Sequence, residues 1–141
     1  MQASRRIVAA QATQLDELKG LPGCGGMGCM ILTVPVTSDG QVDHRFGKAE
    51  TMAVATVIDG RISEWQLHEV GWDILHDQGE HGQHHARIVR FLKEHGVQRV
   101  VFAHAGQPML HTMTKMGLEL VQVGSMEARQ AVIQAALLQA D

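Results

Sequence analysis

Residues 52–67 read MAVATVIDGRISEWQL. The run holds two strand-like stretches, Met52–Ile58 and Arg61–Leu67, which are separated only by Asp59-Gly60. A two-residue Asp-Gly connection is the strongest short-range signal for a β-hairpin, because the favoured turn needs a positive φ angle at both positions. The sequence therefore predicts two adjacent antiparallel strands that are joined at Asp59-Gly60.

Strand and helix signals alternate on both sides of this hairpin. Ile31–Val36 is an almost continuous apolar run, which predicts a central strand buried on both faces. Beyond the hairpin we expect helices at 84–95, from 107 onward and at 126–140, and strands at 100–103 and 118–123. The predicted fold class is α/β, with a five-stranded mixed sheet and the order β-β-β-α-β-α-β-α.

Composition excludes several classes of protein. The chain has 141 residues, 45% of them hydrophobic, which fits one globular domain. A net charge of −3 and an aromatic content of 4% argue against a basic or base-stacking nucleic-acid surface. No apolar run approaches the length of a membrane helix, and no secretory signal is evident. We therefore expect a cytoplasmic protein that binds neither nucleic acid nor membrane.

The chain divides into two parts. Residues 1–30 predict a flexible arm, because five glycines fall between positions 20 and 28. Cys24 and Cys29 lie in or beside this loop, and their thiolates are soft ligands suited to iron–sulfur clusters, zinc or copper. Two free thiols on a mobile arm are the alternative interpretation. Residues 31–141 predict the α/β domain.

The topology suggests where a ligand site lies. If the strand at 52–58 runs opposite to the first strand, the other four strands all end at the same edge of the sheet. The loops 37–50, 68–83, 104–107 and 124–126 then gather at that edge. Ligands of open α/β sheets bind outside the carboxyl ends of strands. The histidines and loop glycines of this chain concentrate in these segments.

The densest candidate site is a histidine-rich run at residues 76–85. Its metal-ligating candidates are His81, His84 and His85, and imidazole is the commonest metal ligand in proteins. His81 and His85 are four residues apart, so one helical turn would place them on one face. A solvated, histidine-rich loop at the start of a helix is the alternative.

Two further segments supply charge and polarity. Ser38, Arg45, Gly47 and Lys48 lie in the loop after the first strand, where Arg45 and Lys48 suit an anionic ligand. Phe46 in the same loop is expected to anchor it in the core. His104 and Gly106 follow a buried strand just before a helix start, a position that attracts anions through free N–H groups.

The sequence lacks the common catalytic motifs. It contains neither a nucleophile elbow nor a phosphate-binding P-loop. A two-metal nuclease needs converging carboxylates, and the strand Ile31–Val36 carries none. We therefore expect a binding protein and not an enzyme.

Several segments in a fixed order carry a family resemblance. They are Val34–Gly40, Arg45–Ala49, Asp59–Ile62, His81-Gly82, Phe102–Gly106 and Met116–Leu118. Together they resemble the dinitrogenase iron–molybdenum cofactor biosynthesis family, of the NifX and NifB-tail type, over about residues 31–138. The resemblance implies a ribonuclease-H-like sheet of five mixed strands. It also maps ligand contacts onto Arg45-Phe46-Gly47, the region of His81 and the turn at Gly106.

The resemblance implies a carrier of metal clusters. Its members bind iron–sulfur or iron–molybdenum clusters non-covalently, so assembly and recipient proteins would be the partners, with a monomer or small homo-oligomer as the expected state. Two alternatives remain open from the residues alone. One is a chaperone or sensor for a single zinc, nickel or copper ion, and the other is an interaction module that binds no metal.

Overall fold

The computed structural model describes residues 29–76 and 81–138. Its sheet has five strands in the spatial order β3-β2-β1-β4-β5. Their bounds are β1 (Cys29–Val36), β2 (Thr51–Ile58), β3 (Arg61–Glu69), β4 (Arg99–Phe102) and β5 (Glu119–Gln122). The helices are α1 (Trp72–Leu75), α2 (His81–Glu94), α3 (Gln107–Lys115) and α4 (Ala128–Leu137), with a short 3-10 helix η1 (Phe46–Lys48) after β1. The fold is therefore α/β, as predicted.

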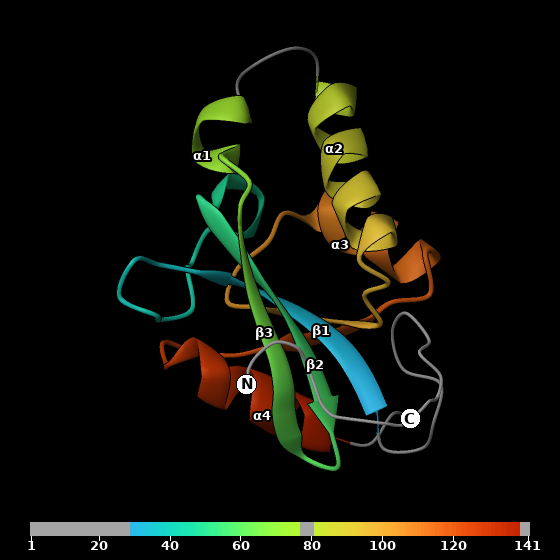
Figure 1. The fold of residues 1–141 in the computed structure, drawn as a ribbon. Helices are drawn as coiled ribbons and strands as arrows, with labels where there is room; N and C mark the ends of the chain where they lie inside the picture. The colour runs from blue at the N-terminus through green and yellow to red at the C-terminus, as the bar shows by residue number, and fades with distance from the viewer. Residues whose placement is uncertain (1–28, 77–80, 139–141) are drawn as a thin grey trace.

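The sheet separates two apolar cores. Helices α1, α2 and α3 cover one face and α4 covers the other (Figure 1). Neighbouring residues of β1 serve the two cores alternately, so that Ile31 packs toward α2 while Leu32 packs toward α4. The last six residues of β1 are all buried, which confirms the prediction of a central strand.

The directions of the strands bring their carboxyl ends together. β1 pairs with β2 antiparallel and with β4 parallel, and β4 pairs with β5 parallel. The β2–β3 hairpin turns at Asp59 and Gly60, whose φ angles are 52° and 81°. Because β2 alone runs the opposite way, β1, β3, β4 and β5 end at the same edge, which decides the strand direction that the sequence leaves open.

The predicted element order needs one correction, between β3 and β4. The expected loop at 68–83 is shorter, because β3 continues to Glu69 and α1 forms at Trp72–Leu75. Trp72 is buried against Phe46 and Phe91, and these two ring contacts hold in place a helix that is too short to show a periodic pattern. Helix α2 begins at His81, three residues before the predicted start.

The predicted arm ends earlier than expected. β1 begins at Cys29, so Cys29 and Met30 belong to the sheet. The remainder of the predicted arm, residues 1–28, lies outside the described residues. No helix in the described part of the chain is long and apolar enough to cross a bilayer.

Candidate functional site

A pocket of about 390 Å³ opens at the carboxyl edge of the sheet. Four segments line it, namely the loop after β1, the end of α1, the first turns of α2, and the loop from β4 into α3. The lining residues are Arg45, Phe46, Gly47, Lys48, His76, His84, His85, Ile88, His104, Ala105, Gly106, Pro108 and Met109. Eight of the predicted site residues are among them, contributed by three separate segments of the sequence.

Asp43 positions the arginine of this pocket. Its carboxylate is buried, with 5% of the residue exposed, and accepts hydrogen bonds from the Arg45 backbone N–H at 3.0 Å and from Arg45 Nε at 3.3 Å. The hydrogen bond and the charge of Asp43 raise the pKa of Arg45, so that the guanidinium stays cationic. Sequence reasoning missed Asp43, because an aspartate two residues before an arginine in a loop forms no characteristic motif.

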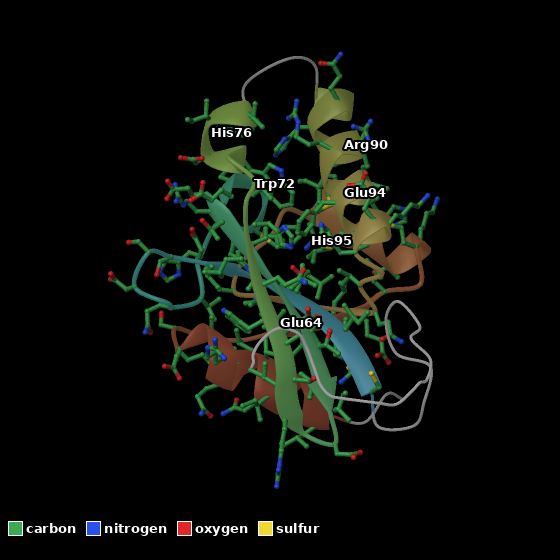
Figure 2. All side chains as sticks on the ribbon, viewed as in Figure 1. Glu64, Trp72, His76, Arg90, Glu94 and His95 are labelled. Atoms are coloured by element: carbon green, nitrogen blue, oxygen red, sulfur yellow. The ribbon has the colours of Figure 1, made fainter. Side chains whose placement is uncertain are left out.

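Phe46 joins the loop to the core and to the second polar segment. Its side chain is buried, and its ring lies 6.2 Å from that of Trp72. Its backbone N–H donates a hydrogen bond to the carbonyl of His104 at 3.2 Å. Figure 2 shows Trp72 at the side of α1 that faces α2. Phe46 is therefore the anchor that the sequence predicts, and it holds the Arg45 and His104 segments side by side.

His84 connects α2 to the same loop. Its Nε2 lies 2.7 Å from the carbonyl oxygen of Gly47, and its Nδ1 lies 2.9 Å from the guanidinium of Arg87. The carbonyl can only accept and the guanidinium can only donate, so the ring is neutral with its proton on Nε2. Arg87 also donates to the carbonyl of Leu75 at 3.2 Å. This chain of hydrogen bonds ties α1, α2 and η1 around the pocket.

The bonds of His84 leave neither ring nitrogen free for a metal in this arrangement. The imidazoles of His85 and His104 are the other two predicted histidines that line the pocket, and His104 is exposed. Arg45 and Lys48 are the charged residues in the lining, and no Asp or Glu is among the described lining residues. The pocket is thus cationic at its rim, while Phe46, Ile88 and Met109 make its floor apolar.

Four predicted residues are not placed in this pocket. Ser38 lines a separate hollow of about 240 Å³ beside Trp65 and Arg129. Cys29 is the first residue of β1, so it lies at the amino end of that strand, whereas the pocket lies at the carboxyl end. The eight residues of β1 separate the two ends by about 23 Å. The sulfur of Cys29 is in a disulfide and so offers no thiolate to a metal. Cys24 and the side chain of His81 lie outside the described residues.

The described residues around the pocket do not form a closed site for a single ion. Within residues 29–76 and 81–138, no group of three or more His, Cys, Asp or Glu side chains is placed to hold a metal ion. Structural single-ion sites usually need four protein ligands and catalytic ones three. The polar groups instead surround a space large enough for a compact molecule.

Comparison with known proteins places this geometry in a family. A family model for the dinitrogenase iron–molybdenum cofactor matches residues 28–138. The chain belongs to this family. Membership links it to the binding or biosynthesis of that cofactor, and members of the family are accessory or carrier proteins more typically than enzymes. No curated protein sequence matches the chain at a significant level.

Solved structures share the fold at low sequence identity. The protein PH0822 has a TM-score of 0.59 at 18% identity, over 75% of this chain and 88% of its own. The apo form of the orange protein from Desulfovibrio gigas has a TM-score of 0.58 at 20% identity, over 73% and 83%. A putative NifB protein from Thermotoga has a TM-score of 0.55 at 19% identity, over 73% and 84%. These likenesses show the fold alone.

The buried histidines predict a loss of stability in acid. Burial lowers the pKa of His84, and the nearby guanidinium of Arg87 lowers it further, while burial also lowers the pKa of His68. In both cases the unfolded state binds a proton at a higher pH than the folded state. The free energy of unfolding should therefore fall as the pH drops through the unfolded value of about 6.5.

Urea unfolding from about pH 7.5 to 5 measures this dependence. The variant His84→Gln keeps a donor for the Gly47 carbonyl but does not titrate, so its stability should depend less steeply on pH than that of the wild type. Equal slopes for the two proteins would show that His84 does not contribute.

Proposed function

We propose that the pocket binds an anionic, sulfide-bridged iron or iron–molybdenum cluster without a covalent bond, and that the protein carries this cluster between others. The observation that supports the proposal most is the lining itself. Arg45 and Lys48 supply positive charge, and His85 and His104 supply nitrogen ligands or hydrogen-bond donors. The lining itself holds no described carboxylate, and the one that pairs with Arg45, that of Asp43, is buried outside it. Family membership supports the class of ligand.

The dimensions of the pocket favour a cluster over a single ion. A volume of about 390 Å³ falls in the range of small-molecule sites and far exceeds what one ion requires. The start of α3 adds a weaker contribution, because the backbone N–H groups beyond Gly106 lie at the positive end of a helix dipole. An anion in the pocket would thus meet favourable charge from side chains and backbone.

The mode of binding suits a cargo that is passed on. Iron–sulfur clusters that stay in a protein are usually held by several cysteine thiolates. None of the described residues that line this pocket is a cysteine. Charge, hydrogen bonds and one or two imidazoles hold a cluster more weakly, which allows release to a recipient protein. This is the basis for proposing a carrier.

Reconstitution without oxygen tests the proposal. The protein would be incubated with iron, sulfide and molybdate, desalted, and examined for bound iron, molybdenum and sulfide and for charge-transfer absorption. We expect stoichiometric metal with sulfide in the wild type, and about a thirtyfold or greater loss of affinity in His85→Ala/His104→Ala, because each of the two lost ligands is worth roughly 1 kcal/mol or more. His111→Ala is the matched control, since His111 is exposed on α3 and does not line the pocket.

The other outcomes separate the competing functions. Retention of zinc, nickel or copper without sulfide would support the chaperone or sensor of a single ion. Absence of any metal under these conditions would contradict both metal functions and leave an interaction module. A cluster that His85→Ala/His104→Ala retains as well as the wild type would place the binding site elsewhere.

A further inference from the structure

Strand β3 forms one edge of the sheet. It has nine residues, whereas β5 at the opposite edge has four, and its outer side pairs with no strand in the described part of the chain. An edge strand of this length is a template for pairing with another strand, and proteins commonly block such edges with lysine or proline. β3 contains neither residue.

The side chains of β3 divide between two faces. Glu64, Gln66 and His68 share one face, where Gln66 donates to Glu64 at 3.0 Å and its amide oxygen lies 3.3 Å from His68 Nε2. Figure 2 shows Glu64 on this strand. Trp65 and Leu67 lie on the face toward α4, where Trp65 stacks under Arg129 at 4.6 Å. Leu67 is 60% exposed.

The order of residues along β3 complements itself about Gln66. Reversing residues 64–68 places Glu64 opposite His68 and Trp65 opposite Leu67. We propose that a second copy of this chain pairs with β3 in the antiparallel sense, with a two-fold axis through Gln66. The two sheets then continue into one sheet of ten strands.

This register gives the side chains on both faces of the strand a favourable partner in the other copy. On the α4 face, each exposed Leu67 packs against Trp65 of the other copy, and aromatic–aliphatic cross-strand pairs stabilise sheets. On the other face, the Glu64 carboxylate accepts a hydrogen bond from His68 of the other copy. No like charges face each other within residues 64–68.

Neighbouring registers are less favourable. An axis between Gln66 and Leu67 would place Glu64 opposite Glu69, but these two side chains lie on opposite faces of β3, whereas opposed residues of an antiparallel pair share a face. An axis through Trp65 would place Leu67 opposite Ser63. The pairing of β3 with β2 shifts between Glu64 and Ile62, so Ser63 lies at a β-bulge where regular pairing is interrupted. The axis through Gln66 uses only the regular part of the strand.

Sedimentation velocity over a concentration series tests self-association of the full chain. We expect a weak dimer in the micromolar range, because pairing of two edge strands buries less area than a standard interface. Leu67→Lys should weaken the dimer by about tenfold or more, since it blocks the edge with a charge. Ile74→Lys is the matched control, because Ile74 is 64% exposed but lies on α1.

A cysteine variant tests the register. Gln66→Cys should form a disulfide between two copies on mild oxidation, because residues on the axis face each other at about 5 Å. Glu64→Cys should not, since its two copies lie about 13 Å apart at the usual rise per residue. A chain that stays monomeric at every concentration overturns the proposal, as would occur if another segment of the same chain covered β3. A dimer unaffected by Leu67→Lys, or one that Gln66→Cys does not cross-link, also overturns it.

Discussion

The double reversal Arg45→Glu/Lys48→Glu is expected to abolish retention of the reconstituted cluster, with a loss of about a hundredfold or more in affinity. Both side chains line the pocket, and the carboxylate that pairs with Arg45, that of Asp43, is not among the described lining residues. The substitution turns two favourable charge interactions into two repulsive ones at close range, and each is worth roughly 1–2 kcal/mol in a partly solvated site. Bound iron and sulfide after desalting measure the effect.

The control must separate local charge from net charge. Arg61→Glu/Arg90→Glu changes the net charge by the same amount, and both arginines are exposed and do not line the pocket. This control should retain the cluster. Equal loss in the two variants would mean that cluster binding depends on the overall charge of the protein and not on this pocket. Raising the salt concentration should weaken the wild type, as expected of charge attraction near the surface.

The elements of the fold that are set by local sequence were predictable. Asp59-Gly60 specifies its own turn, because few residue pairs accept two successive positive φ angles, and the structure shows both. Gly96 likewise follows the end of α2 with a positive φ angle of 63°, which glycine adopts without strain. The direction of β2 was the one topological choice, and once it is fixed, the gathering of Arg45, His84 and His104 at one edge follows from the connections alone.

The position of Ser38 depends on contacts that its own loop does not reveal. The turn after β1 returns to the sheet through a bridge between Val36 and Val42, and a second bridge joins Gln41 to Glu127. The N–H of Val42 also donates to the carbonyl of Met126 at 2.9 Å. These long-range bonds draw residues 37–41 toward α4, so that Ser38 lies in the other hollow while Arg45 remains in the pocket.

The groups that position the pocket were also beyond prediction. Asp43, Trp72 and Arg87 bind no proposed ligand and show no motif, and their partners become clear only in the folded chain. Arg87 is three residues after His84, a spacing that places both on one helix face. However, the carbonyls of Gly47 and Leu75 that complete their hydrogen bonds come from distant segments. Sequence patterns locate the chemistry of a site more readily than its support.

Phe46→Ala is expected to lower the free energy of unfolding by about 3–4 kcal/mol, the usual cost of removing a buried aromatic ring. Only 1% of Phe46 is exposed, and its ring packs in the core with Trp72 and Ile88. Removal leaves a cavity beneath η1, which the surrounding helices fill only in part. Urea denaturation at neutral pH measures the loss.

The same variant should also weaken cluster binding under conditions where the protein is folded. Phe46 lies between Arg45 and Lys48, so loosening its anchor increases the freedom that both cations lose when a ligand binds. Phe46→Leu is the matched control, because it keeps an apolar side chain in the core, and should cost about 1–1.5 kcal/mol and retain most of the binding. If Phe46→Ala lowers the free energy of unfolding by less than about 1 kcal/mol, the ring is not the anchor of this loop. Should it destabilise the fold yet bind the cluster as tightly as the wild type, the position of the 45–48 loop would not determine affinity.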